Sequence, residues 1–526
     1  MHTLHIHNLS YQHPDGQTQF KQLSFSINEK LTAIIGANGS GKSILLSILA
    51  NQQQPSTGHV EFSGTRVLIS QQQLSEQHLQ TSSSTIAQLL GVDKKLAALN
   101  RIEQGSCHEA DFNLINDDWL CEQYYKQQLL ALAIDTSLNQ PIKHLSGGQQ
   151  RRLMLFCALQ TKPDLLILDE PSNHLDQSAK QWLIDQLHAF KGQVIVVSHD
   201  RQLLNQCDAI IELSSQGVHY ETGNYQHFSQ QKSLQQTALT KQINNLDKER
   251  QKHLQQTQLN REKAQQRAAQ GNKKRNTTSQ PKVMLDFKKN SAQASKGASE
   301  RLASAKRKAL TEKRQTLQQQ LPNSKAKTVK FTQPTSNKRL LFIEKLTLPF
   351  SSANKAITLQ IFSGDKLHLK GANGSGKSTL LRMINDSANS PVSTALQLNS
   401  KVLYIDQHSS FLGATDTLCN ALEKHCQLKQ QTVRHLLANI GFKGENIYRP
   451  ISQLSGGEKM QLAMLIAAQN AQHYLLLLDE PDNHLDLANK QQLAQNLADF
   501  TGSFILVSHD EEFIKQSNVL TNIILK

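Results

Sequence analysis

The sequence predicts an α/β fold that occurs twice in one chain. Two copies of one eight-residue string, at 36–43 and 371–378, lie 335 residues apart. Each copy is followed in the same order by LSGG, LDEP, NHLD and VSHD. Apolar strands alternate with helical stretches around these strings, a pattern typical of a sheet covered by helices. We therefore predict two tandem P-loop domains, at 1–223 and 338–526, joined by a linker at 224–337.

Each glycine-rich string lies between an apolar strand and an apolar helix. The strands are expected at 31–35 and 366–370, directly before the two strings. Further strands are expected where short apolar runs occur, at 165–168, 194–197, 475–478 and 504–507. This order of strand, loop and helix is the context in which a GxxxxGK[ST] string binds phosphate.

The two repeats differ in length. The first has about 26 more residues than the second between its glycine string and its LSGG string, and we expect them in a helical insertion at about 86–138. This insertion is either a longer pair of surface helices or an arm that docks on a large partner.

The linker is predicted to form two helices. Residues 224–270 contain no Gly or Pro, and their apolar residues are sparse, which favours a protruding helix of about 70 Å. We expect Gly271 to end this helix, residues 271–297 to form a polar tip, and a second helix to return over 298–321. Disorder is the alternative, because Gln, Lys and Ser dominate the segment.

The positive charge of the chain is concentrated in this linker. Residues 241–330 contain 23 Lys and Arg but six Asp and Glu, an excess of +17, whereas the whole chain carries +14. Helical surfaces that are merely solvated usually mix acids with bases at i,i+4 spacing. The imbalance therefore predicts a polyanionic partner, with nucleic acid the first candidate.

Composition excludes several other classes of protein. No run approaches the ~18 apolar residues that a membrane span needs, so no membrane partner is expected. The first ten residues lack the basic and apolar regions of a signal peptide. The six cysteines show no CxxC and no metal-ligand spacing, as in reduced cytoplasmic proteins.

The glycine strings predict nucleotide binding at the start of a helix. Glycines let the backbone N–H groups wrap around phosphates. The lysine of each string would reach the β- and γ-phosphates of ATP, and the serine hydroxyl would bind Mg²⁺. The phosphate-binding residues are expected to be Gly36, Asn38, Gly39, Ser40, Gly41, Lys42 and Ser43, and in the second repeat Gly371, Asn373, Gly374, Ser375, Gly376, Lys377 and Ser378.

Each repeat also has an acidic pair at the end of an apolar strand. A carboxylate at the end of a buried strand is costly unless it has a function. Asp169 and Asp479 are expected to hold the metal, and Glu170 and Glu480 to polarise the attacking water. The histidines of the two VSHD strings, His199 and His509, are expected to contact the γ-phosphate; the alternatives are a plain charge pair and structural histidines.

The LSGG strings begin helices and form anion-binding nests. Because each repeat already has a complete glycine loop, the nest of one repeat is expected to contact the nucleotide of the other. The residues concerned are Ser146, Gly147, Gly148 and Gln149, and in the second repeat Ser455, Gly456, Gly457 and Glu458.

With these motifs in both repeats, the chain resembles the ATP-binding cassette family in its soluble two-cassette form. The resemblance covers about 410 residues and implies a head-to-tail pairing of the cassettes with two ATP molecules at their interface. It also implies that Gln72 and Gln407 sense the metal and the water, and that Tyr11 stacks on adenine. The matching position in the second repeat is Leu348, so stacking there is expected either to be weaker or to involve Phe350 instead.

The NHLD strings narrow the resemblance to the ABC-F subfamily. That resemblance implies a protein that works on ribosomes, with a basic interdomain hairpin that enters the tRNA exit site toward the peptidyl-transferase centre. Two residues depart from the subfamily pattern, because Ser172 and Asp482 stand where Thr is usual. An acid so close to the ATP interface is expected to slow or bias the second site.

The leading hypothesis is therefore a cytoplasmic, monomeric ATPase that contacts 23S rRNA and P-site tRNA. It would act either as a translation factor or as an antibiotic-resistance factor. A DNA-associated ATPase is one alternative, although only 16 residues follow Asp510, which leaves no room for a C-terminal coiled coil. A transporter subunit is the other, although the basic linker does not favour it.

Overall fold

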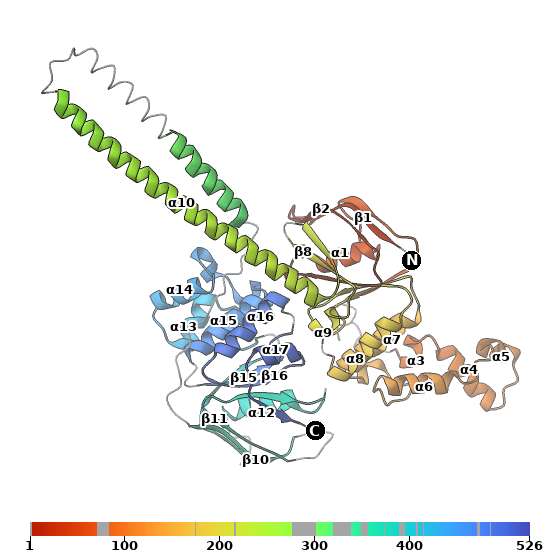
Figure 1. The fold of residues 1–526 in the computed structure, drawn as a ribbon. Helices are drawn as coiled ribbons and strands as arrows, with labels where there is room; N and C mark the ends of the chain where they lie inside the picture. The colour runs from red at the N-terminus through yellow and green to blue at the C-terminus, as the bar shows by residue number, and fades with distance from the viewer. Residues whose placement is uncertain are drawn as a thin grey trace. The chain divides into compact units, whose positions relative to one another are not determined.

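A computed structural model of the chain describes most of both repeats and most of the linker helices (Figure 1). The described residues are 3–70, 84–173, 175–214, 217–275, 301–318, 338–348, 356–372, 374–388, 395–406, 409–413, 415–470, 474–483 and 485–525. The chain divides into two compact units, one with residues 1–225 and 326–526 and one with residues 226–325. Both repeats lie in the first unit and the predicted linker helices lie in the second.

The first repeat contains a six-stranded sheet and a smaller three-stranded sheet. The large sheet has the order β5-β6-β7-β3-β8-β9, with β5 to β8 parallel and β9 antiparallel at the edge. The small antiparallel sheet has the order β2-β1-β4. The strands are β1 (Leu4–Gln12), β2 (Thr18–Ile27), β3 (Leu31–Gly36), β4 (Thr57–Glu61), β5 (Arg66–Ile69), β6 (Leu165–Asp169), β7 (Gln193–Val197), β8 (Ala209–Ser214) and β9 (Gly217–Thr222).

Helices cover the large sheet, and its central strands β6 and β7 are mostly apolar. Every residue of β6 and β7 is buried, as expected for parallel strands covered on both faces. One core lies between the two sheets and α1, and includes Ile34, Leu45 and Ile167. The helices are α1 (Lys42–Leu49), α7 (Gly147–Gln160), α8 (Gln177–Ala189) and α9 (Arg201–Leu204).

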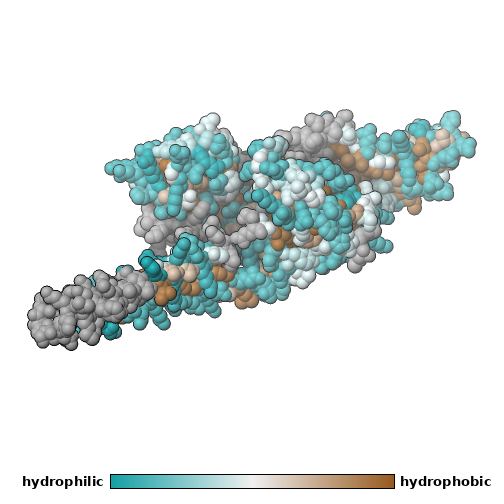
Figure 2. Space-filling view, turned by 90° about the horizontal axis from the view of Figure 1, so that it is seen from above, coloured by the Kyte–Doolittle hydropathy of each residue, from teal (hydrophilic) through white to brown (hydrophobic). Residues whose placement is uncertain are grey.

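The predicted insertion forms an arm of short helices with a core of its own. The arm contains α3 (Ile86–Leu89), α4 (Asp93–Glu103), α5 (Glu109–Ile115) and α6 (Cys121–Ala131). Buried side chains such as Leu96, Ile115 and Leu129 hold the helices together. Its surface is partly apolar, with Trp119 49% and Leu120 68% exposed, and Figure 2 shows apolar side chains among polar ones over the arm.

The second repeat has the same architecture without the longer arm. Its large sheet has the order β14-β15-β16-β12-β17, all parallel, and its small antiparallel sheet the order β11-β10-β13. The strands are β10 (Arg339–Leu346), β11 (Ile357–Phe362), β12 (Lys366–Lys370), β13 (Leu396–Leu398), β14 (Lys401–Ile405), β15 (Tyr474–Asp479), β16 (Ser503–Val507) and β17 (Thr521–Ile524). The helices are α12 (Lys377–Ser387), α13 (Leu418–Cys426), α14 (Gln430–Asn439), α15 (Gly456–Gln469), α16 (Leu487–Asp499) and α17 (Glu511–Gln516).

The linker is helical, and its first helix is longer than the sequence predicts. Helix α10 (Tyr225–Arg275) passes through Gly271, so the expectation that this glycine ends the helix is wrong. A glycine in a helix interior costs only about 1 kcal/mol relative to alanine, which the neighbouring hydrogen bonds of a long helix outweigh. Residues 276–297 of the predicted tip lie outside the described residues.

A second helix over residues 301–318 lies beside α10 (Figure 1). Arg314 Nε donates to Asp247 Oδ1 at 2.8 Å, and Lys306 Nζ lies 3.7 Å from Glu249 Oε1. Both contacts join one helix to the other, as in a helical hairpin. The predicted fold class, two tandem α/β domains joined by a basic helical linker, is thus confirmed.

None of the described helices combines the length and the apolarity that crossing a bilayer requires.

Candidate functional site

The first glycine loop connects the end of β3 to the start of α1. Gly39 and Gly41 have φ values of 80° and 92°, in the left-handed region that favours glycine. A Cβ atom on Gly36 would lie 2.4 Å from the Leu213 carbonyl oxygen, so this position also requires glycine. Lys42 Nζ donates to the carbonyls of Gly36 at 2.8 Å and Ala37 at 3.0 Å, which holds the ammonium group over the loop.

The second glycine loop has the same geometry. Lys377 Nζ donates to the carbonyls of Gly371 at 2.7 Å and Ala372 at 3.0 Å. Gly376 has a φ of 90°, and a Cβ there would lie 2.8 Å from Leu348 Cδ1. Burial lowers the pKa of both loop lysines, although nearby carboxylates oppose that shift. The predicted Asn373 lies outside the described residues.

A serine and an aspartate meet beside each glycine loop. Ser43 Oγ donates to Asp169 Oδ2 at 2.9 Å, and Ser378 Oγ donates to Asp479 Oδ1 at 3.0 Å. Burial raises the pKa of both aspartates, because the charged form is desolvated. Hydroxyl and carboxylate oxygens next to a phosphate loop are the donor set that Mg²⁺ prefers, so the residues present fit this ion. The predicted Gln72 and Gln407 lie outside the described residues.

The second site contains a tyrosine that the sequence did not indicate. Tyr404, on β14, donates its hydroxyl to Asp479 Oδ2 at 2.9 Å. Burial and the adjacent carboxylate raise the pKa of this hydroxyl, which therefore stays protonated and acts as a donor. The matching position in the first repeat is Leu68, which pairs with Ile167 as Tyr404 pairs with Leu477, and its side chain cannot hydrogen-bond. The two aspartates that are expected to hold the metal thus have different surroundings.

Glu170 follows β6 directly and has an unusual backbone conformation. Its φ is 51°, and that of Glu480 is 50°, in the left-handed region that non-glycine residues seldom adopt. Such strain of about 1–3 kcal/mol persists where the surrounding structure imposes it, and it is frequent at functional sites. The shared conformation directs both glutamates away from the line of their strands.

Glu170 and His199 face each other, but they do not form an ion pair. Glu170 Oε1 lies 3.5 Å from His199 Nε2. Burial raises the pKa of Glu170 to about 8 and lowers that of His199 to about 3, so the histidine is neutral at physiological pH. Among the described residues, Glu170 Oε1 and His199 Nδ1 have no hydrogen-bond partner. Two buried polar atoms are therefore left for a ligand or water.

The second repeat repeats this pair with a looser contact. His509 Nε2 lies 3.8 Å from Glu480 Oε1, and burial lowers the pKa of His509 to about 4. Asn483 donates its side-chain amide to Glu480 Oε2. The second glutamate is therefore held by an amide as well as facing the histidine.

A cleft of about 520 Å³ joins these groups in the first site. Its lining contains the predicted Asn38, Gly39, Gly41, Lys42, Ser43, Asp169, Glu170 and His199. His13, Gln19, Asn173 and Val197 line it as well, together with Leu485 and Lys490 of the second repeat. The site is thus composed from both repeats, as expected, but the contributing residues of the second repeat differ from those predicted.

The LSGG residues do not line this cleft. Ser146 and Ser455 begin α7 and α15, and each forms a capping box with Gln149 or Glu458 three residues later. The expected contact of Ser455–Glu458 with the first nucleotide site is not formed in this arrangement. Both predicted nests therefore lie at the start of a helix. Glu458 Oε1 also lies 3.8 Å from Arg449 Nη1.

Tyr11 does not line the cleft either. Its ring packs on the core between the two sheets, and its hydroxyl accepts a hydrogen bond from Gln53. The ring of His13 stands edge-on to that of Tyr11, with the ring centroids 5.3 Å apart, and His13 lines the cleft. In the second repeat Leu348 packs against the glycine loop at Gly376, as shown above.

Two lysines connect the repeats, and motif matching did not find them. Lys490 Nζ, on α16, donates to the His199 carbonyl at 3.3 Å, and Lys180 Nζ, on α8, donates to the His509 carbonyl at 3.3 Å. Each also faces the aspartate that follows the histidine in its own repeat, Lys490 with Asp510 at 3.4 Å and Lys180 with Asp200 at 2.6 Å. Asn38 N adds a further contact between the repeats, to Asp486 Oδ2 at 3.2 Å.

The matched spacing of these lysines was a signal in the sequence. Both lie four residues after the aspartate of NHLD, and both follow it on the helix that this aspartate caps. Each lysine thus links the histidine backbone of the opposite site to an acid of its own repeat.

Asp482 makes the surroundings of Lys490 different from those of Lys180. Its side chain is buried, and burial raises its pKa to about 6 even though the charge of Lys490 opposes the shift. Burial disfavours the charge of Lys490, but the carboxylates of Asp482 and Asp510 outweigh it and raise the pKa of the lysine. The matching Ser172 instead bonds its hydroxyl to that of Ser198 at 3.0 Å. The second repeat therefore holds one more buried carboxylate.

Comparison with known proteins agrees with this site. Residues 20–173 and 354–483 match the family described as "ABC transporter". The chain is 29% identical to "Ribosome protection protein VmlR" of Bacillus subtilis, over 97% of this chain and 84% of that protein. It is 29% identical to "Probable ATP-binding protein YheS" of Haemophilus influenzae, over 95% and 76%. "ABC transporter F family member 4" of Arabidopsis thaliana is also 29% identical, over 95% and 70%.

Solved structures share the tandem arrangement. The archaeal ribosome recycling factor aABCE1, solved in complex with the stalk protein aP1, has a TM-score of 0.55 at 16% identity, covering 97% of this chain and 86% of that one. A structure titled "RNase-L Inhibitor" has a TM-score of 0.53 at 15% identity, covering 98% and 87%. At these identities the likeness concerns the fold.

Proposed function

This chain is a two-cassette ATPase that belongs to the ATP-binding cassette family, and its relatives include F-family members; we propose that it is a cytoplasmic ATPase that acts on the ribosome. The observation that carries the proposal is the exposed basic helical hairpin that connects the two cassettes along the chain. The name of the Bacillus relative, a ribosome protection protein aligned over 97% of this chain, supports the same partner.

The hairpin presents basic side chains along both helices. Most of its described Lys and Arg residues are exposed. The exposed ones are Lys241, Lys248, Lys252, Arg261, Lys263, Arg267, Arg301, Lys306, Arg307, Lys308 and Lys313. Such side chains bind phosphates without reading base sequence, which suits a surface of folded RNA.

We propose that this hairpin enters the tRNA exit site and contacts 23S rRNA and P-site tRNA near the peptidyl-transferase centre. An uninterrupted helix of 51 residues extends about 75 Å at 1.5 Å per residue, long enough for such a reach. The arm formed by α3 to α6, with its exposed Trp119 and Leu120, would provide a second, partly apolar contact. Apolar patches of this kind are typical of protein contacts.

ATP hydrolysis would use the groups already brought together. Lys42 and the loop N–H groups hold the phosphates, and Glu170 polarises the attacking water, for which a carboxylate with a raised pKa is suited. When bound to Ser43 and Asp169, Mg²⁺ would neutralise charge on the phosphates. His199 stays neutral and can accept or donate a hydrogen bond at the terminal phosphate.

The lysine contacts suggest how ATP controls the hairpin. ATP at the interface would draw Ser455–Glu458 toward the first cleft, which requires the two cassettes to close further. Lys180 and Lys490 would transmit this closure between the sites, because each contacts both repeats. Closure would favour ribosome binding, and hydrolysis would release the protein. The use made of this cycle is either translation control or ejection of antibiotics from the peptidyl-transferase region.

A double substitution tests the ribosome proposal. Glu170→Gln with Glu480→Gln should trap the closed form, so that the full chain pellets with 70S ribosomes in ATP but not in ADP. Duplex DNA and anionic lipid vesicles, offered in parallel, test the DNA-associated and transporter alternatives. If the trapped variant stays in the supernatant with ribosomes, or pellets with DNA instead, the proposal is wrong.

A second variant tests the hairpin itself. Replacing Arg261, Lys263 and Arg267 with Gln in the trapped background should weaken ribosome pelleting and flatten its dependence on salt. The control carries the same charge change on the cassettes, at the exposed Lys21, Lys191 and Lys443. Equal pelleting by the two triple variants would show that the hairpin is not the contact.

A further inference from the structure

Four polar residues gather on the outer face of the small sheet of the first repeat. Residues at alternate positions of a strand point to the same face, so His5 and His7 share a face of β1, as do His59 and Glu61 of β4. The register of the two strands places His7 opposite His59 and His5 opposite Glu61. Three imidazoles and one carboxylate thus occupy adjacent positions of one exposed surface.

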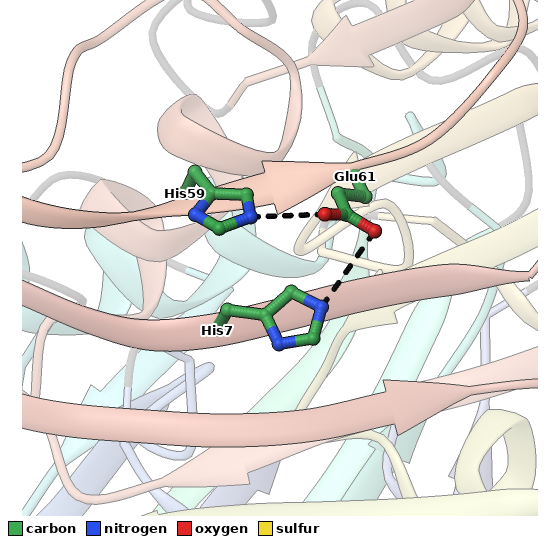
Figure 3. Close-up of side chains that lie close together, drawn as sticks. All are labelled: His7, His59 and Glu61. Carbon is green, nitrogen blue, oxygen red and sulfur yellow. Dashed lines mark hydrogen bonds and ion pairs between the residues drawn. The ribbon is translucent and has the colours of Figure 1, made fainter.

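Three of these residues direct their ligand atoms to one point (Figure 3). His59 Nε2 lies 2.9 Å from Glu61 Oε1, and His7 Nε2 lies 3.7 Å from Glu61 Oε2. The ligand atoms of all three lie within 4.8 Å of one another. The rings of His7 and His59 are stacked, with centroids 5.1 Å apart and an angle of 27° between them.

We propose that His7, His59 and Glu61 form a binding site for a divalent transition-metal ion, with Zn²⁺ the preferred occupant. Imidazole nitrogen and carboxylate oxygen are the ligands that zinc takes when it keeps an open position. Metal–ligand bonds of about 2.0–2.2 Å need ligand atoms roughly 3–4 Å apart, close to the separations present here. A water molecule would complete the coordination.

The surroundings of Glu61 support a cation site. Each oxygen of the Glu61 carboxylate faces one imidazole, Oε1 that of His59 and Oε2 that of His7. His5 Nδ1 is hydrogen-bonded to Ser26 Oγ at 2.8 Å, so the other ring nitrogen of His5, Nε2, takes no part in that bond. Imidazole nitrogens thus lie next to both oxygens of one carboxylate on this face.

The second repeat shows that the fold does not require these residues. Asn8 in β1 and Lys345 in β10 both have a positive φ, so we treat them as matching positions of the two strands. On that alignment, Glu344 matches His7, and Ala395 and Gln397 match His59 and Glu61. The same sheet forms there without a histidine at any of these positions. Packing of the sheet thus gives no reason for the cluster.

A bound ion would join β1 to β4, two strands separated by more than 40 residues of chain. Metal binding to the native state alone stabilises that state by mass action. The ligands are half exposed, with 49%, 59% and 63% of the His7, Glu61 and His59 side chains accessible. The ion can therefore enter and leave without any opening of the core. Binding should weaken as the pH falls, because a bound imidazole must be deprotonated.

The test measures zinc bound to the full chain after removal of any purification tag. Equilibrium dialysis against Zn²⁺, with metal analysis of the protein, should show one more equivalent in the natural chain than in His7→Gln/His59→Gln. Co²⁺ used in place of Zn²⁺ should give tetrahedral absorption bands that this variant lacks. Zn²⁺ should also raise the melting temperature of the natural chain and not that of the variant.

A matched control is available on another strand. His219 and Glu221 on β9 form a similar pair at 4.0 Å, without a second histidine in the cluster. His219→Gln should keep the full zinc stoichiometry. Glu61→Gln provides a second variant at the site and should weaken zinc binding at least 10-fold. Equal zinc content in the natural chain and in His7→Gln/His59→Gln would overturn the proposal.

Discussion

Replacing Lys490 with methionine should destabilise the paired cassettes. Lys490 Nζ lies 3.4 Å from Asp510 Oδ2, and the ammonium group also interacts with the buried carboxylate of Asp482. Methionine fills a similar volume without a charge, so the change removes the charge and the contact to the His199 carbonyl while preserving most of the packing. Two carboxylates would then remain in a buried site without their cation.

The expected size follows from the burial of these groups. The Lys490 and Asp510 side chains are 13% and 12% exposed, and Asp482 is 3% exposed. Removing one partner of a buried ion pair costs about 3–5 kcal/mol, or about 6–20 °C in melting temperature for a domain of this size. The loss should be smaller at pH 5.5 than at pH 8, because the pKa of Asp482 is already about 6 and rises further without Lys490.

A double-mutant cycle with Asp482→Ser measures this interaction. Serine is the residue of the first repeat, where Ser172 bonds to Ser198. Asp482→Ser should offset the effect of Lys490→Met by about 1–3 kcal/mol at pH 8, as residues in direct electrostatic contact do. Melting temperatures at pH 5.5 and pH 8 for the four proteins give the result. Additive effects at both pH values would refute the reasoning.

Three further predictions concern the two ATP sites. Asp482→Ser alone should increase the free energy of unfolding at pH 8 by about 2–3 kcal/mol more than at pH 4, as measured by thermal unfolding. The pKa of Asp482 is higher in the folded state than in the unfolded state. This carboxyl group therefore stabilises the fold at low pH, and the stabilisation is lost as the pH rises through about 6. Glu170→Gln and Glu480→Gln should each lower the turnover of their own site by about 100-fold or more, because the attacking water is no longer polarised. Tyr404→Phe should raise the Mg²⁺ concentration required by the second site by about 10-fold, since Asp479 loses a hydrogen bond that orients it; Mg²⁺ titration of ATP hydrolysis in the Glu170→Gln background measures this.

A specific result would contradict each of these three predictions. A pH-stability profile of Asp482→Ser that matches the natural chain would show that Asp482 does not titrate between pH 4 and pH 6. Full turnover after either glutamine substitution would assign water activation to another group. An unchanged Mg²⁺ requirement in Tyr404→Phe would mean that Asp479 is oriented without the tyrosine.

Local sequence strings predicted the positions that depend on local backbone geometry. The glycine loop at 36–43 requires positive φ at Gly39 and Gly41, and the loop lysine then reaches the carbonyls at its own start. The acidic pairs follow directly from strand ends, and their burial follows from the apolar strands before them. These features need few residues in sequence, so a repeated motif is sufficient to predict them.

Helix length was less predictable, because it depends on many weak contributions. Gly271 is unfavourable in a helix by about 1 kcal/mol, yet α10 continues to Arg275. The LSGG motif also did not determine which groups the first residues of these two helices contact. Ser146 and Ser455 form capping boxes within their own helices and do not line the described cleft.

The sequence by itself thus determined the duplicated fold, the glycine loops with the acidic pairs at the strand ends, and the charge of the linker. Only the tertiary structure placed Lys490 against the His199 carbonyl, Tyr404 against Asp479, and His7 beside His59 and Glu61. The physical reason is the distance along the chain. A local string carries its own backbone conformation, whereas these contacts join residues 52 to 291 positions apart, which only sheet register and the packing of one repeat on the other bring together.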